Sequence, residues 1–288
     1  MLGKRRLVLS IHAASFPSLA EEDFGRGVAG GRGGTALLAF AHALGFDAVQ
    51  LGPSGETQRE DASPYASTFF ARDTVSVDFF GLARDPEWAG FVDAALLERA
   101  VAQNPARETG RCAHAYAHAA SRTLLDTMHT RFLAARETPR GQAIARAMQA
   151  RSLRHGDWIA RERIALGRDE PEDRHALAQL VAGESHDAFR RAAHALGVAV
   201  FGDLAVGSPT ARAIGGELFL DDYVLGAPPS RTNPEGQPWG YPVLDPTLYG
   251  EHGDGPAAAF LRARIGVLLD AHDGMRIDHP HGLVCPWV

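Results

Sequence analysis

Hydrophobic residues along this chain repeat one arrangement: a segment with helical spacing of apolar residues, then a glycine, then a short apolar run. Apolar residues three and four positions apart predict a helix, and a following glycine suits the left-handed residue that closes it. The copies predict helices over residues 35–44, 186–196 and 257–272, closing glycines at Gly45, Gly197 and Gly274, and strands over 48–53, 198–203 and 275–279. An apolar run over residues 7–12 predicts one more strand.

These apolar runs lack the alternation of hydrophobic and polar residues that is typical of a strand with one exposed face. Continuous apolar strands indicate burial on both faces, as in a parallel sheet. Strands that alternate with helices predict α/β architecture. The expected fold is therefore α/β, with four parallel strands connected mainly by helices.

A long segment, residues 55–184, separates the second and third expected strands. It is too long for a simple crossover, and its apolar periodicity predicts helices over 91–103, 112–136, 141–151 and 157–166. We therefore expect a mostly helical subdomain at 55–184, inserted into a barrel domain formed by residues 1–54 and 185–288.

A second irregular region, residues 226–246, is rich in proline and glycine, which excludes a regular helix or a central strand. We expect a long ordered loop over the carboxyl ends of the strands. Its aromatic residues Trp239 and Tyr241 would either bind the apolar faces of sugar rings or anchor the loop to the core, and the sequence leaves both open.

Composition and charge make some classes of function less favoured for this chain. The formal net charge is −6, from 29 basic and 35 acidic residues, which gives no general attraction to nucleic acid or to anionic membranes. The two cysteines, Cys112 and Cys285, form neither a metal-ligand spacing nor a disulfide framework, so we expect a reducing, cytoplasmic setting and no metal. No segment approaches the roughly 20 apolar residues of a membrane helix.

Polar residues lie in the expected strands or at their ends, at His12, Gln50, Asp203, Asp278 and His279. In parallel α/β folds, catalytic groups gather at the carboxyl ends of strands. Arg276 precedes Asp278 by two residues, so both side chains face the same side of a strand. An arginine beside a carboxylate favours its ionised form, which a nucleophile in retaining glycosidic cleavage requires. Asp203 could bond sugar hydroxyls, hold Arg276 or cap a turn.

Segments of the chain, in the same order as in the family, resemble the amylomaltase-type 4-α-glucanotransferases of glycoside hydrolase family 77. Residues 9–18 resemble the family's first strand and its Leu-Pro-Ser turn, and residues 49–53 with 63–67 resemble its Leu-Pro-x-x-Pro and Ser-Pro-Tyr segments. Gly202-Asp203-Leu204 and Gly236-Gln237-Pro238-Trp239-Gly240 resemble its third-strand region, and Met275-Arg276-Ile277-Asp278-His279 matches its nucleophile strand.

The resemblance implies a (β/α)8 barrel fold of the TIM type and a reaction that moves an α-1,4-glucan segment to the 4-hydroxyl of an acceptor glucan or to water. The reaction would pass through a covalent glycosyl-enzyme without any cofactor, and α-1,4-glucans or malto-oligosaccharides would be the partners. The resemblance makes Asp278 the nucleophile and Arg276 the residue that orients it, and it places Tyr65, Asp203, Trp239 and His279 at the substrate.

Some residues depart from the family pattern. Residues 280–282 read Pro-His-Gly where the family has Phe-Arg-Gly, residues 205–208 differ from its third-strand segment, and Tyr241 replaces an asparagine.

A (β/α)8 barrel needs eight strands, and the sequence predicts about the first four. We therefore expect an incomplete barrel that lacks the family's acid/base glutamate and is inactive by itself. The alternatives are a non-catalytic glucan- or partner-binding relative, and an unrelated α/β barrel enzyme.

Overall fold

Four parallel strands form the centre of the molecule. The computed structural model describes residues 6–167 and 169–288, without the side chains of 153–156, so residues 1–5 of the expected barrel segment lie outside it. The strands pair in the order β1-β2-β3-β6, all parallel, with bounds Val8–Ile11, Ala48–Leu51, Ala199–Leu204 and Gly274–Ile277. This sheet confirms the α/β fold expected from the apolar runs.

Two of the three predicted closing glycines have the expected conformation. Gly45 follows α1 (Arg32–Ala43) with φ 90°, and Gly197 follows α6 (Glu172–Ala195) with φ 75°. The prediction for Gly274 is wrong, because this residue begins β6 and lies opposite Phe201 of β3. A Cβ atom on Gly274 would lie 2.5 Å from the Phe201 ring, so glycine is needed here for packing between strands.

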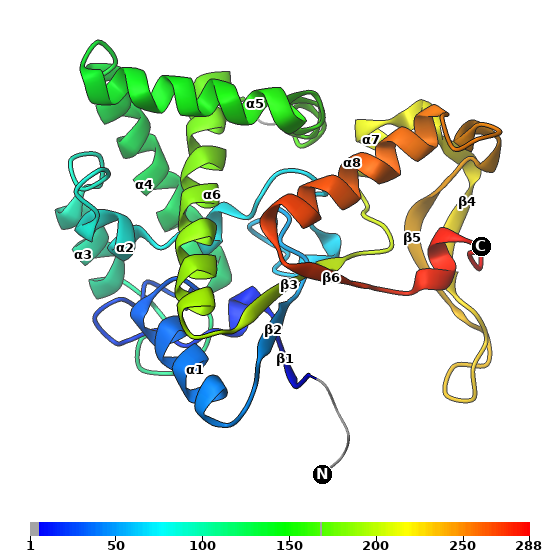
Figure 1. Ribbon diagram of the computed structural model, residues 1–288, viewed down its shortest axis with the longest axis horizontal. Helices are drawn as coiled ribbons and strands as arrows, with labels where there is room; N and C mark the ends of the chain where they lie inside the picture. Colours follow the sequence, from blue (N-terminus) through cyan, green and yellow to red (C-terminus); the bar gives the residue numbers. More distant parts are fainter. Residues whose placement is uncertain (1–5, 168) are drawn as a thin grey trace.

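Helices dominate the region between β2 and β3 (Figure 1). They are α2 (Phe79–Arg84), α3 (Ala94–Ala102), α4 (His114–Ala134), α5 (Pro139–Ala165) and α6. The sequence predicted two helices, 141–151 and 157–166, where α5 is one continuous helix. A helix gains most of its stability from packing, here against α6, which local periodicity does not show. The division at 184/185 stays a prediction, and α6 runs across that position without interruption.

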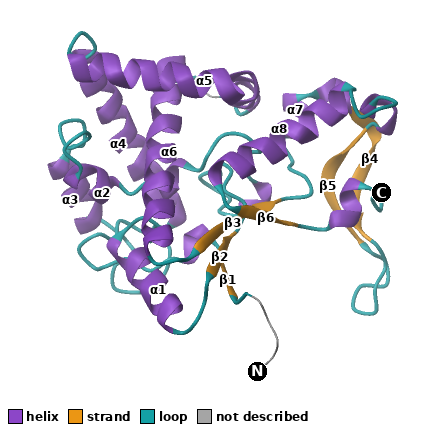
Figure 2. Ribbon diagram, viewed as in Figure 1, coloured by secondary structure: helices purple, strands orange, loops and turns teal. Residues whose placement is uncertain are grey.

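The expectation of a long loop at 226–246 is wrong. Residues Phe219–Ala227 (β4) and Gln237–Leu244 (β5) form a two-stranded antiparallel ribbon, drawn on the right of Figure 2. Pro238 and Pro242 both lie on β5, which pairs with β4 alone among the described strands, and an edge strand tolerates proline. The prolines exclude a central strand, as the sequence indicated, without excluding an isolated ribbon.

An aromatic cluster packs helix α5 against the C-terminal part of the chain. Phe260 of α8 (Pro256–Ala271) is fully buried. Its ring makes edge contacts with four aromatic rings from three parts of the chain, at centroid distances of 5.2–5.8 Å: Phe69, Phe70, Trp158 and Phe219. α5 also contacts the short helix α7 (Ala211–Ile214). In the parts of the chain described, no helix is long and apolar enough to cross a membrane.

Acid should destabilise the fold through a pair of buried histidines. Burial, helped by the charge of Arg72, lowers the pKa of His272 to about 4, and the His186 ring lies 4.8 Å away. The unfolded chain takes up this proton near pH 6.5, so the contribution of His272 to stability falls by about 3 kcal/mol as pH falls from 6.5 to 4. Urea unfolding at pH 7.5, 5 and 4 measures this contribution as the difference between the wild-type protein and His272→Gln, because the other buried groups titrate in both proteins. An equal pH dependence in both proteins would contradict this prediction.

Candidate active site

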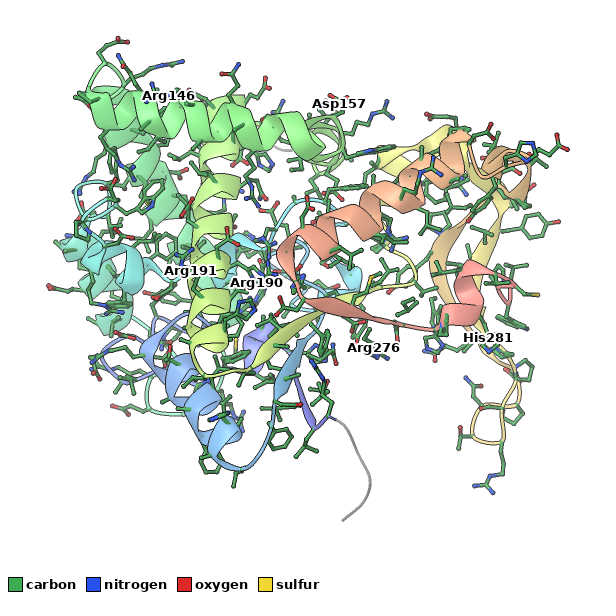
Figure 3. The ribbon with its side chains drawn as sticks, in the orientation of Figure 1. Arg146, Asp157, Arg190, Arg191, Arg276 and His281 are labelled. Carbon is green, nitrogen blue, oxygen red and sulfur yellow. The ribbon has the colours of Figure 1, made fainter. Side chains whose placement is uncertain are left out.

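Register between β3 and β6 brings three charged side chains together. Asp203 pairs with Arg276 across the two strands, and the backbone amide of Asp278 donates to the carbonyl of Leu204 at 3.1 Å. Arg276 Nη1 lies 3.0 and 2.9 Å from the two carboxylate oxygens of Asp203, and its Nη2 donates to Asp278 Oδ1 at 2.5 Å. One guanidinium on β6, labelled in Figure 3, therefore contacts both carboxylates, that of Asp203 on β3 and that of Asp278 directly after β6.

The two carboxylates differ in their surroundings. The Asp203 side chain is 1% exposed, whereas that of Asp278 is 13% exposed and that of Arg276 is 45% exposed. Burial raises the pKa of Asp203, the Arg276 charge opposes this shift, and the Asp278 charge adds to it. Asp203 is thus enclosed as the buried partner of Arg276, while Asp278 retains contact with solvent, where a substrate would bind.

Tyr65 lies next to this charged group on a short 3-10 turn, η2 (Pro64–Ala66). Burial raises the pKa of Tyr65, the charges of Asp203 and Asp278 raise it further, and a hydrogen bond from Arg276 lowers it. The ring packs edge-on against His12 at 5.8 Å, and the Tyr241 hydroxyl donates to the Tyr65 carbonyl at 3.2 Å. The turn, β1 and the ribbon thus hold the phenol beside Arg276.

His279 directly follows Asp278 in an unusual backbone conformation. Its φ of 43° is the only left-handed one at a non-glycine residue among those described. Such a conformation costs free energy and often marks a functional position. The His279 ring lies 4.8 Å from Trp239 of β5, and Trp239 lies 6.5 Å from Tyr241. An aromatic surface therefore stands beside the carboxylate of Asp278.

The structure brings together the six residues that the family resemblance implies for this site, and their roles stay predictions. Trp239 contacts His279 and Tyr241 donates to the carbonyl of Tyr65, while both side chains also pack against a small core cluster, so a role of Trp239 in sugar binding stays a prediction. Gln50 lies further back in the sheet, where its side chain accepts from Ser10 Oγ at 2.6 Å. Among residues 6–167 and 169–288, no cluster of three or more histidine, cysteine or acidic side chains could hold a metal ion.

Comparison with known proteins agrees with this geometry. Residues 11–288 match the model of the glycoside hydrolase 77 family, described as 4-alpha-glucanotransferase. The solved structure of an amylomaltase from Streptococcus agalactiae in complex with acarbose is similar in fold, with a TM-score of 0.76 at 20% sequence identity. The match covers 98% of this chain and 61% of that protein, so this chain spans less than two thirds of its length. No curated protein matches the chain.

The family match and the fold agree with each other. The parallel sheet corresponds to part of the amylomaltase barrel, as the sequence predicted. An unrelated α/β enzyme, one of the alternatives, is thereby excluded. Because the family model spans nearly the whole sequence, the chain belongs to the glycoside hydrolase 77 family of 4-alpha-glucanotransferases.

Proposed function

We propose that this chain carries the nucleophile and part of the glucan-binding surface of a retaining 4-α-glucanotransferase. Asp278 is the nucleophile, Arg276 orients it, and Tyr65, Asp203, Trp239 and His279 surround the bound sugar. The observation that carries this proposal is the single guanidinium that bridges Asp203 and Asp278 at the ends of two paired parallel strands. Nucleophiles in such folds lie at this edge of the sheet.

In the proposed reaction, an oxygen of Asp278 attacks the anomeric carbon of a glucose unit as the bond to the leaving 4-oxygen breaks. The leaving oxygen takes a proton from an acid, and a glycosyl ester remains on Asp278. The 4-hydroxyl oxygen of an acceptor glucan then attacks the same anomeric carbon, the bond to Asp278 breaks to free its carboxylate, and the hydroxyl proton returns to the base form of that acid. The second displacement restores the original anomeric configuration. Retaining chemistry needs the acid and the nucleophile roughly 5 Å apart, on opposite sides of the bond.

Asp203 is poorly placed to be that acid. Both of its carboxylate oxygens face Arg276 Nη1, and its side chain is 1% exposed. We therefore propose that the chain by itself binds glucan and accepts a glycosyl group from an activated donor. Transfer between ordinary malto-oligosaccharides would need a proton donor other than Asp203. The acarbose complex of the amylomaltase supports an oligosaccharide as the ligand of this site.

Glucan binding should depend on Trp239. The half-buried indole lies beside His279 and can pack on the apolar face of a sugar ring. Calorimetric titration with maltoheptaose and acarbose should show binding to the wild-type protein, and Trp239→Ala should weaken it by about 10-fold, or roughly 1.4 kcal/mol.

The control for this change is Tyr223→Ala, which removes an exposed aromatic ring from the neighbouring strand β4 and should leave the affinity unchanged. A wild-type protein that binds neither ligand would refute the glucan-binding assignment. Glucan binding without any glycosylation by an activated donor would favour the non-catalytic relative instead.

A further inference from the structure

We propose that Glu162 of α5 is a positioning residue for the candidate active site, because its carboxylate holds the backbone of residues 69–71 and thereby the segment that presents Tyr65 to Arg276. This inference rests on the proposed function, since it assigns a role to a residue far from the sugar. It extends that function because it connects helix α5 to the candidate active site.

Both carboxylate oxygens of Glu162 accept hydrogen bonds from the backbone. The Glu162 side chain is fully buried, and its carboxylate accepts from three successive amides: Phe69 at 2.5 Å, Phe70 at 2.9 Å and Ala71 at 2.6 Å. Successive backbone amides that converge in this way form a binding site for an anion. In this fold the anion is a side chain from a distant helix.

The segment held by Glu162 leads directly to the active site. Three residues separate Tyr65 from Phe69 in the chain. Between them, the carbonyl of Ser67 accepts from the Ser208 hydroxyl at 2.7 Å, and the Tyr65 carbonyl accepts from the Tyr241 hydroxyl. The segment is therefore fixed at its front by side chains from around β3 and the ribbon, and at its back by Glu162.

Arg264 of α8 provides a second connection between the same parts. Its guanidinium lies 3.7 Å from the centroid of the Phe69 ring and donates to the carbonyl of Ala205, two residues after Asp203. Burial lowers the pKa of this arginine to about 10, and the negative charge of Glu162 opposes this shift. Glu162, Phe69 and Arg264 thus link α5 to the end of β3.

The carboxyl group of Glu162 should respond to pH near neutrality. Burial raises its pKa to about 7, the three amides oppose this shift, and the charge of Glu56 adds to it. The charged groups that face it are Glu56 from the segment after β2 and Arg264 from α8. Opening of the segment would expose Glu162 to water and return its pKa towards 4.5, so the closed form is favoured at low pH and opens as pH rises through 7.

Amide hydrogen exchange of residues 65–73, corrected for the intrinsic exchange rate, tests this role. In the wild-type protein the opening equilibrium should rise by about 20-fold between pH 5.5 and 7.5. Glu162→Gln should abolish this pH dependence, whereas Asp157→Asn, an exposed change on the same helix (Figure 3), should retain it. A wild-type opening equilibrium that is independent of pH would overturn the proposal, and this measurement does not require a variant that folds.

The affinity for glucan tests whether Glu162 acts on the candidate active site through the Tyr65 segment. If Glu162 acts through the Tyr65 segment, Glu162→Gln should weaken maltoheptaose binding several-fold in the wild-type background and have little effect in a Tyr65→Phe background. Additive effects would show that Glu162 acts elsewhere and would overturn the proposal. A wild-type protein that binds no glucan would refute the proposed function, while the exchange experiment would still decide whether Glu162 holds the segment.

Discussion

Asp278→Asn should abolish fluoride release from α-maltosyl fluoride by this chain, a loss of about 10⁴-fold or more. The amide cannot supply the anionic oxygen that attacks the anomeric carbon, and its nitrogen faces the same Arg276 that fixes the carboxylate. Fluoride departs without a proton, so the experiment tests the nucleophile separately from any acid. The wild-type protein should release fluoride and gain the mass of one maltosyl group.

The site of attachment distinguishes this chemistry from hydrolysis elsewhere on the protein. Peptide mapping of the glycosylated wild-type protein should place the maltosyl group on Asp278. The matched control is Asp222→Asn, which changes an exposed aspartate on β4 and should leave fluoride release intact. Equal release by wild type and Asp278→Asn would contradict the assignment of Asp278 as the nucleophile.

Arg276→Met should lower the free energy of unfolding and also the rate of glycosylation. The change leaves the buried carboxylate of Asp203 next to that of Asp278 without the positive charge between them. Loss of one partner of a fully buried ion pair costs about 3–5 kcal/mol, but Arg276 is 45% exposed, so we expect roughly 2 kcal/mol. Urea unfolding measures the stability, and fluoride release measures the glycosylation rate.

A second substitution separates the two effects of Arg276. Asp203→Asn in the Arg276→Met protein removes the buried charge and should restore most of the stability, without restoring glycosylation. Arg231→Met, an exposed change between β4 and β5, should alter stability by less than about 0.5 kcal/mol. A fully stable Arg276→Met single variant would show that the bridge between the carboxylates does not support the fold.

The sequence predicted the parts of the site that local patterns encode. Apolar runs located the four strands, and the spacing of Arg276 and Asp278 placed both side chains on one side of β6. The contact between Arg276 and Asp203 was one of several possibilities, because the register of β3 against β6 depends on which residues pack and not on either strand alone. The resemblance to the family connected these residues to Tyr65 and Trp239.

Other features needed the three-dimensional structure. The β4–β5 ribbon was missed because its prolines indicated a loop, and only the pairing in the structure shows that they lie on an edge strand. Glu162 lies between two arginines, which is typical of a solvated helix face. A signal was nevertheless present, since Glu162 follows Trp158 by four residues and precedes Ala165 by three, on the apolar side of α5.

The continuous helix α6 has a consequence for how the chain folds. β2 and β3 are neighbours in the sheet, yet residues 52–198 separate them, whereas a much shorter segment separates β1 from β2. Bringing β2 and β3 together closes a long segment of chain and therefore costs conformational entropy. Contacts between residues so distant in the sequence form slowly during folding. α6 packs against α4 and α5 and delivers β3 at its end. Collapse of the helices would therefore precede assembly of the sheet, and the helical segment would act as the nucleus on which the sheet is completed.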